Sequence, residues 1–144
     1  MKEAIDAYCL ACGQALPSTP GDYCRCIFRS LAMRCRQVTE VLASLSPHPL
    51  RRLHVIGGGI RNGFLMQYLA DSLGLELLCG PVEGTAMGNA LLQARAVGLC
   101  GGLAQMRAVS SASVETQRYL PSADRSAEYA DFLRIQSIYN NNAI

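Results

Sequence analysis

The stretch VIGGGIRNGFLMQYLADSLG, residues 55–74, places three consecutive glycines between a short β-branched run and an amphipathic segment. A glycine-rich turn between a strand and a helix lets a ligand approach the main chain and meet the N–H groups of a helix start. The spacing is neither G-x-G-x-x-G nor G-x-x-x-x-G-K-[ST], so the usual dinucleotide and P-loop patterns do not apply. The pattern predicts an α/β layer with an accessible turn, and it leaves an ordinary tight turn without a ligand open.

The residues around the glycines predict two strands and one helix. Leu53 to Ile56 forms a short strand that ends on Gly57, and Leu75 to Cys79 forms a second one. Asn62 is suited to cap the intervening helix, and Gly74 is suited to follow its last turn. The expected apolar face of this helix consists of Leu65, Tyr68, Leu69 and Leu73.

Upstream of this core, the sequence predicts a helical hairpin. Residues 2–12 form a short helix, and glycines and prolines break the chain before Asp22, which we expect to cap a long helix that ends near Leu45. Apolar residues recur along this helix at steps of three and four, which predicts one buried face. That face consists of Cys24, Phe28, Leu31, Cys35, Val38, Leu42 and Leu45.

Downstream, helices follow. Thr85 is expected to cap a third helix that presents small side chains, and its face consists of Met87, Ala90, Leu91 and Ala94. A short helix over Leu103 to Val109, a polar linker over Ser110 to Ser113 and a last helix over Glu128 to Tyr139 complete the chain. The prediction is a helix-rich α/β layer with a two-stranded sheet. Two strands are marginal alone, so we expect a fragment of a larger domain.

Composition limits the function classes. The 144 residues suit one domain, half of them are hydrophobic, and thirteen basic against eleven acidic residues leave a formal charge of +2. The arginines form no block, so we expect no nucleic-acid partner. No apolar run reaches membrane-span length and no signal core opens the chain, so we expect no membrane association and a cytoplasmic location. His48 and His54 have no telling partners and are expected to be structural or exposed.

Seven cysteines at mostly helical positions indicate buried free thiols in a reducing compartment. Cys9 and Cys12 with Cys24 and Cys26 leave a zinc-binding module open, although C-x-C spacing is poor for zinc. We predict no metal ligands in this chain. The hairpin also brings Cys9 or Cys12 close enough to Cys24 or Cys26 for a disulfide on oxidation.

The run RRLHVIGGGIRNGFLMQYLADSLGLELLCGPVEGTAMGNALLQARAVG, residues 51–98, resembles the carboxy-terminal nucleotide-binding lobe of the FGGY carbohydrate kinases. EAIDAYC (residues 3–9), CIFRSLAMRCRQV (residues 26–38) and GPVEGTAMGN (residues 80–89) are similar to the rhamnulokinase branch of that family. The resemblance covers roughly residues 2–138, which is nearly the whole chain.

The resemblance implies a fold and a binding site. The expected fold is part of an actin-like (ribonuclease H-like) ATPase lobe, and ATP lies between two such lobes in this family. Gly57, Gly58 and Gly59 would form the adenosine-side turn, with Gly58 the most direct contact, and Asn62 would cap the next helix beside the nucleotide. The segment of Glu83, Gly84, Thr85 and the Met87 helix would pack against that turn.

The resemblance also implies an incomplete enzyme. The expected organisation is a helical hairpin over residues 1–50, an adenosine-binding core over 51–98, and terminal helices over 99–144. The phosphate-binding loop, most sugar contacts and the catalytic Asp of the family lie upstream, so we predict no catalytic residue and no activity for these 144 residues alone.

The activity implied for the intact enzyme is transfer of the ATP γ-phosphoryl group, with Mg²⁺, to a ketose, L-rhamnulose first. A fuculokinase or xylulokinase and a non-catalytic binding or assembly module remain open. An incomplete lobe also exposes apolar surface, which predicts self-association.

Overall fold

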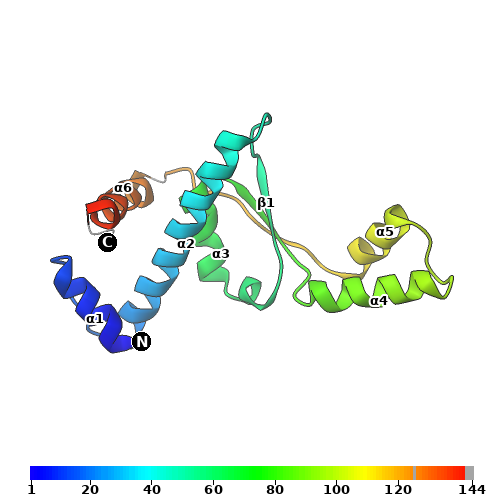
Figure 1. Cartoon of the computed structure of the whole chain (residues 1–144), viewed down its shortest axis with the longest axis horizontal. Helices are drawn as coiled ribbons and strands as arrows, with labels where there is room; N and C mark the ends of the chain where they lie inside the picture. Colours follow the sequence, from blue (N-terminus) through cyan, green and yellow to red (C-terminus); the bar gives the residue numbers. More distant parts are fainter. Residues whose placement is uncertain (125, 142–144) are drawn as a thin grey trace. The chain divides into compact units, whose positions relative to one another are not determined.

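The protein is described by a computed structural model that covers residues 1–124 and 126–141 (Figure 1). Its elements in chain order are α1 (Lys2–Ala11), α2 (Pro20–Leu45), β1 (Arg52–Val55), the 3-10 helix η1 (Gly58–Arg61), α3 (Gly63–Leu73), β2 (Glu76–Cys79), α4 (Gly84–Ala96), α5 (Leu103–Ser113), β3 (Gln117–Tyr119) and α6 (Ser126–Asn141).

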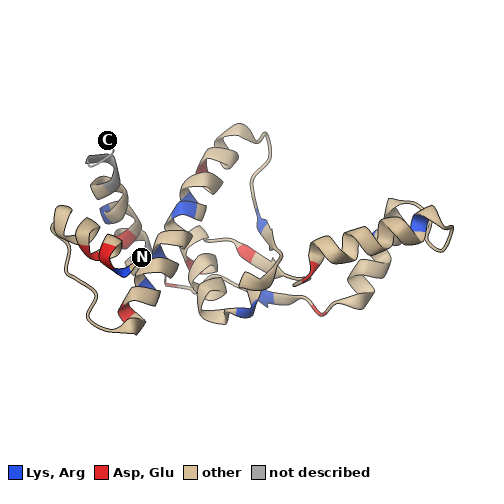
Figure 2. Ribbon diagram, turned by 60° about the horizontal axis from the view of Figure 1, so that its bottom comes forward, with Lys and Arg blue, Asp and Glu red and all other residues tan. Residues whose placement is uncertain are grey.

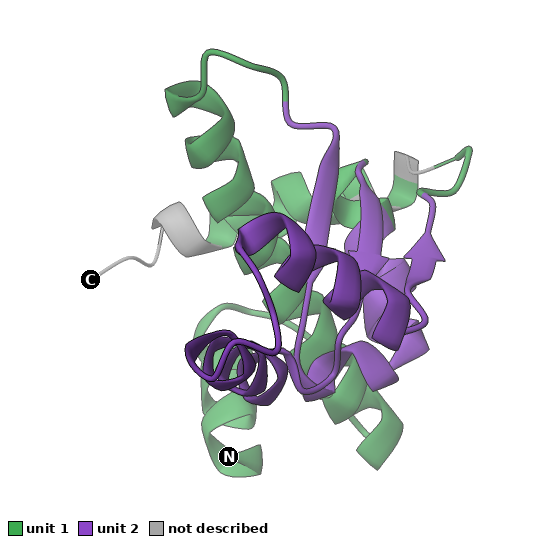
Figure 3. Ribbon diagram, turned by 90° about the vertical axis from the view of Figure 1, so that its right-hand side faces the viewer, with its two compact units in different colours: residues 1–49, 71–74, 121–144 green, residues 50–70, 75–120 purple. Residues whose placement is uncertain are grey.

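The chain divides into two compact units (Figure 3). Unit 1 holds Met1–Pro49, Asp71–Gly74 and Pro121–Ile144, and unit 2 holds Leu50–Ala70 and Leu75–Leu120. All three strands belong to unit 2, whereas α1, α2 and α6 belong to unit 1. The predicted division of the chain at residues 50 and 98 stays a prediction.

The long helix α2 ends at Leu45 as predicted, but it begins before Asp22. Thr19 is its N-cap: the Thr19 hydroxyl accepts a hydrogen bond from the Asp22 N–H at 3.2 Å, and the Asp22 carboxylate accepts one from the Thr19 N–H at 3.0 Å. Pro20 at the first helical position needs no hydrogen-bond acceptor for its nitrogen. Asp22 is therefore the N3 partner in a reciprocal capping box, and its assignment as the cap itself was wrong.

The buried face of α2 differs from the predicted one. Ala32 and Met33 are its buried residues, at 0% and 4% exposure. Arg36 adds to this side, because its guanidinium stacks on the rings of Tyr129 and Phe132 in α6 and donates to the Ser72 carbonyl at 2.7 Å. Most of the predicted face is instead exposed, namely Cys24, Leu31, Cys35, Val38, Leu42 and Leu45.

The sheet of unit 2 has three strands in the order β1-β2-β3, where two were predicted. β1 and β2 are parallel and are joined through α3, with Leu53 opposite Leu77. β3 pairs antiparallel with β2 and places Arg118 opposite Leu78. The third strand was missed because its three residues show no apolar alternation.

Glu76 of β2 links the two outer strands. Its carboxylate accepts from Arg52 Nε of β1 and from Arg118 Nε of β3, both at 2.7 Å. The Arg52 and Arg118 hydrogen bonds lower the pKa of Glu76 against the effect of its desolvation. The ion pairs of Glu76 therefore stabilise the pairing of β3 with β2, although the hydrophobic pattern of the sequence does not indicate a strand at β3.

The helix that follows the glycines has the predicted caps. The Asn62 side-chain oxygen accepts the Leu65 N–H at 3.0 Å, and Gly74 adopts φ +68° after the last turn. Of the expected face, Leu69 is buried and the other three residues are half-buried. Met66 and Ala70 are more deeply buried than predicted, at 2% and 0% exposure.

The second helical pair of unit 2 departs from prediction at its ends. α4 begins one residue before Thr85, so the Thr85 cap was wrong, and α5 continues to Ser113 through the predicted linker. Figures 1 and 2 show α4 and α5 side by side, and the Ser110 hydroxyl lies 3.1 Å from the Met87 sulfur. α6 contains the predicted last helix within Ser126–Asn141.

Charge is interspersed along the described elements, with acidic and basic side chains on the same helices (Figure 2). Across residues 1–124 and 126–141, the helices lack the combination of length and apolar character that a membrane crossing requires. His48 and His54 were expected to be structural or exposed, and both are exposed.

Candidate functional site

The glycine turn forms at the end of β1. Gly57 adopts φ +94°, a conformation that side-chain-bearing residues rarely take. Its N–H donates to the Pro81 carbonyl at 3.2 Å, and its carbonyl accepts from the Ile60 N–H at 3.2 Å. The first glycine is thus required by the backbone, and it leads directly into η1.

Gly58 and Gly59 differ from Gly57 in what their surroundings require of them. A Cβ atom placed on Gly58 or Gly59 would meet no heavy atom within 4 Å, and neither residue has a positive φ. The packing of the chain therefore does not require glycine at these two positions. Open space over bare backbone is the arrangement that a ligand close to the main chain needs.

A second segment forms the opposite wall. The Gly80 N–H donates to the Val55 carbonyl at 2.9 Å, and the following cis Gly80–Pro81 bond leads the chain toward α4. A Cβ on Gly84 would lie only 3.3 Å from Ile56 Cδ1. Glycine at this position lets the first turn of α4 approach the end of β1 closely.

The two segments line an open cavity of about 400 Å³ within unit 2. Its lining consists of Ile56, Gly57, Gly58, Val82, Glu83, Gly84 and Thr85. Of the four predicted site residues, Gly57 and Gly58 line this cavity, whereas Gly59 and Asn62 do not. The side-chain oxygen of Asn62 is used in the helix cap described above.

The segment after Pro81 was expected mainly to pack against the glycine turn, and besides contacting the turn it also lines the cavity. Glu83 is the N-cap residue of α4, but its side chain makes no capping hydrogen bond. The sequence signal for a cavity-lining role of Glu83 is an acidic residue followed by a glycine at the start of a helix. This signal alone does not distinguish a helix cap from a ligand contact.

The residues that line the cavity carry few polar side-chain groups. They include one hydroxyl, that of Thr85, and one carboxylate, that of Glu83, and no His or Cys. Among the residues that the structure describes, no group of three or more His, Cys, Asp or Glu side chains is arranged to hold a metal ion.

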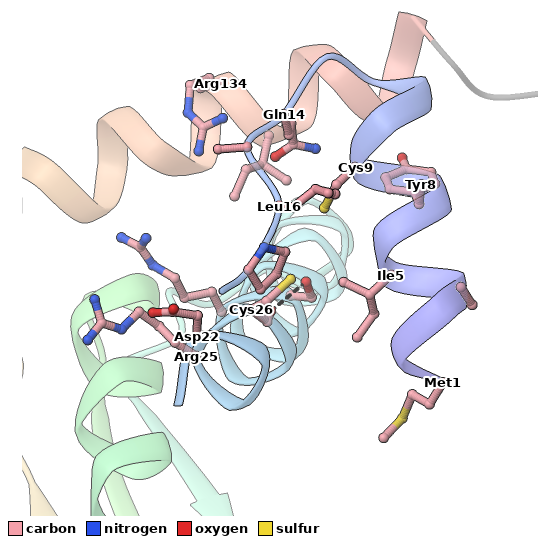
Figure 4. A pocket seen from close by; sticks show the side chains of 16 residues that line it. Met1, Ile5, Tyr8, Cys9, Gln14, Leu16, Asp22, Arg25, Cys26 and Arg134 are labelled. Atoms are coloured by element: carbon pink, nitrogen blue, oxygen red, sulfur yellow. Dashed lines mark hydrogen bonds between the residues drawn. The ribbon is translucent and has the colours of Figure 1, made fainter. Parts of the chain in front are cut away.

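Unit 1 has a separate cavity of about 540 Å³ beside α1 and α2. Figure 4 shows the thiols of Cys9 and Cys26 among the side chains that line it, together with apolar residues such as Ile5 and Leu16. All seven cysteines are free thiols, as predicted, but only Cys9, Cys79 and Cys100 are buried, so the expectation that most of the cysteines are buried was wrong. Burial, with a further contribution from Cys26, raises the pKa of the Cys9 thiol.

Comparison with known sequences gives one family. The FGGY family of carbohydrate kinases, C-terminal domain, matches residues 1–97. A rhamnulokinase from Bacteroides thetaiotaomicron is 44% identical over 137 residues, which cover 95% of this chain and 28% of the relative. A rhamnulokinase from Pectobacterium carotovorum is 40% identical over 124 residues, which cover 86% of this chain and 25% of the relative.

Comparison with solved structures gives the same family. Xylulose kinase from Rhodospirillum rubrum superimposes with a TM-score of 0.65 and 26% identity over 90% of this chain and 26% of the neighbour. Glycerol kinase from Plasmodium falciparum, solved with ADP, gives a TM-score of 0.62 at 17% identity over 90% of this chain and 25% of the neighbour, which shows the fold alone.

These matches confirm the predicted family resemblance and the predicted fold class, a helix-rich part of an actin-like ATPase lobe with a small sheet. The chain spans about a quarter of the length of the curated relatives that it matches.

Proposed function

The chain belongs to the FGGY family of carbohydrate kinases, and from this membership we propose that it forms the adenosine-side wall of the nucleotide site in an ATP-dependent sugar kinase. The observation that carries the proposal is the open space above Gly58, a cavity-lining glycine with no packing reason to be glycine. Gly57 shapes the turn, Gly59 continues it, and Asn62 holds the following helix beside the nucleotide.

The sugar that we propose is L-rhamnulose, converted to L-rhamnulose 1-phosphate. The support is that the two relatives described above at 40% identity or more are rhamnulokinases. A xylulokinase is the second candidate, because xylulose kinase is a structural neighbour at 26% identity. A fuculokinase remains the third candidate, and the residues of this chain do not decide among the three.

The remaining catalytic parts are proposed to come from outside these residues. Phosphoryl transfer needs a base for the sugar hydroxyl, phosphate ligands and Mg²⁺ held among them. Within the described part of the chain, the cavity supplies one carboxylate, and no three or more His, Cys, Asp or Glu side chains are grouped to hold a metal ion. Mg²⁺ would therefore be held by the ATP phosphates and by the other lobe, and the chain alone is expected to be inactive. The intact kinase is proposed to work in the cytoplasm.

A pair of chimaeric kinases tests this function. In one, this chain replaces the matching carboxy-terminal quarter of the Bacteroides thetaiotaomicron rhamnulokinase, and in the other it replaces that of the Rhodospirillum rubrum xylulose kinase. The measurement is ATP-dependent phosphorylation of the host's own ketose, with folding checked by thermal unfolding. We expect the rhamnulokinase chimaera to be active and the xylulose kinase chimaera to be much weaker, because interfaces inside a domain tolerate mismatch poorly.

Two results contradict the proposal. A folded rhamnulokinase chimaera without activity would remove the nucleotide-wall assignment and favour a non-catalytic binding module. Higher activity in the xylulose kinase host would move the assignment to the xylulokinase alternative.

The chain is also proposed to self-associate through the apolar stripe of α2, defined as Leu31, Val38, Val41, Leu42 and Leu45. These side chains are between 46% and 76% exposed, and they follow the helical repeat along one side of unit 1. Burying such a stripe against a second copy removes apolar surface from water.

A further inference from the structure

Glu83 is an exposed residue that lines the cavity beside the glycine turn, and the fold leaves its carboxylate without a partner among the described residues. Glu is not among the residues preferred at an N-cap, and the Glu83 side chain makes no capping hydrogen bond to the first turn of α4. Within residues 1–124 and 126–141, Glu83 also takes part in no ion pair or other side-chain hydrogen bond. Its presence at this position is therefore not explained by the stability of α4.

The charge of Glu83 determines which end of a nucleotide lies beside it. The phosphates of ADP and ATP are anionic and are repelled by a carboxylate, whereas the ribose is neutral and donates hydrogen bonds through its hydroxyl groups. A carboxylate has two acceptor oxygens, which suit two neighbouring hydroxyl groups. Hydrogen bonds to an ionised acceptor are also stronger than those between neutral groups.

We propose that Glu83 recognises the ribose, by accepting hydrogen bonds from the 2′ and 3′ hydroxyls of a nucleotide bound against Gly57 and Gly58. This inference rests on the proposed function, because it takes the cavity to be the nucleotide site. Two observations carry the inference. Glu83 and Gly58 line the same cavity of about 400 Å³. The hydrogen bond from the Gly57 N–H to the Pro81 carbonyl holds together the two segments to which they belong. That volume lies toward the small end of ligand pockets, roughly 300–1,000 Å³, and suits the nucleoside rather than the whole nucleotide.

The test compares ADP with 2′,3′-dideoxy-ADP as ligands of the full 144-residue chain, with dissociation constants measured by calorimetric titration. For the wild-type chain we expect ADP to bind about tenfold more tightly, the size of effect that follows from losing charge-assisted hydrogen bonds. In Glu83→Ala we expect this ratio to fall to about one, because the acceptor is gone. The affinity for the dideoxy nucleotide should stay equal or rise, because a repelling charge is removed.

Glu115→Ala is the matched control. Glu115 lies in the same unit and outside the cavity, so this variant removes the same charge without touching the proposed contact. We expect the control to keep the tenfold preference for ADP. A merely structural role of Glu83 would weaken both nucleotides equally and leave the ratio unchanged.

Several results overturn the inference. Equal wild-type affinity for the two nucleotides would do so, and so would a preference that survives in Glu83→Ala. Loss in Glu83→Ala of a preference for ADP over inosine diphosphate, with the ribose preference intact, would assign the carboxylate to the adenine amino group instead. Failure of the wild-type chain to bind ADP at all would contradict the proposed function itself, and with it the premise of this inference.

Discussion

At the residue scale, two adjacent glycines in the turn have opposite reasons to be glycine. Gly57 is fixed by its backbone, since φ +94° is strained for any residue with a side chain. Gly58 has no positive φ and free space at its Cβ position, so neither its backbone conformation nor its packing requires a glycine there. A pair of substitutions therefore separates the stability of the turn from its binding function.

Gly58→Val should impair nucleotide binding with little loss of stability. In the rhamnulokinase chimaera we expect the KM for ATP to rise about tenfold or more, equivalent to about 1.4 kcal/mol, with the KM for the sugar almost unchanged. Gly57→Val is the comparison, and we expect it to lower the free energy of unfolding by about 1 kcal/mol or more. Equal rises in both KM values for Gly58→Val would indicate a damaged fold and contradict the role of Gly58.

At the scale of elements, strongly periodic segments and capping residues could be predicted, and pairing partners could not. The strand, Asn62-capped helix and strand between residues 52 and 79 follow from local signals, because period, cap and terminal glycine agree. The third strand lacks such a signal and depends on Glu76 and Arg118. The predicted buried face of α2 was wrong, because the helix buries Ala32 and Met33 and contacts α6 through Arg36, rather than through the predicted apolar residues.

In the candidate site, too, some residues could be predicted from the sequence and others could not. The glycines were assigned to the site through the family resemblance of residues 51–98, because three glycines after a strand alone leave an ordinary tight turn open. Glu83 and Thr85 were expected beside the glycines, but mainly as packing or capping residues, because their place in the cavity depends on the course of the chain after Gly80.

The amino-terminal end of α2 should lose stability in acid. Hydrogen bonds from Thr19, and then from Ser18, lower the pKa of Asp22 from its usual value of 3.8 to about 2. A lowered pKa in the folded state adds stability above the unfolded value, and this stability is lost as the pH falls from about 4 through 2. Thermal unfolding followed by circular dichroism between pH 5 and pH 2 should show a smaller acid loss for Asp22→Asn than for the wild-type chain.

Glu115→Gln serves as the control for this acid effect and should keep the wild-type profile. Identical acid profiles for Asp22→Asn and the wild-type chain would contradict the capping box as a source of stability.

The hairpin of α1 and α2 should close through one disulfide on oxidation. Cys9 and Cys26 line the same cavity, and the Tyr23 hydroxyl holds α2 to α1 by donating to Asp6 at 2.6 Å. With oxidised glutathione, two protein thiols become one disulfide and two glutathione molecules are released. We expect mass spectrometry of the alkylated, unreduced chain to find Cys9 joined to Cys26.

The reaction should speed up as the pH rises past 9, because burial raises the pKa of Cys9 above its usual value. Cys12 and Cys24 should remain free and become alkylated. Alkylation of every cysteine after oxidation would rule the bridge out, and a bridge to Cys12 or Cys24 would show that the pairing is different.

At the scale of the whole molecule, the chain is a family member that spans about a quarter of its relatives and exposes much apolar surface. The exposed stripe of α2 predicts concentration-dependent association in sedimentation experiments. Leu42→Asp, at a side chain that is 54% exposed, should shift the chain toward monomer without loss of helix content. Leu99→Asp, at an exposed residue of the other unit, is the control and should leave association unchanged. Equal effects of the two variants would contradict the stripe as the contact surface.

The assignment of the glycine turn to nucleotide binding is tested most directly by a titration of the isotope-labelled chain with ADP, followed through its backbone amide resonances. The account predicts saturable shifts concentrated at Gly57, Gly58 and the first turn of α4, where the cavity of unit 2 lies. Shifts confined to the cavity beside Cys9 and Cys26, or unmoved amides at Gly57 and Gly58 under millimolar ADP, would contradict it.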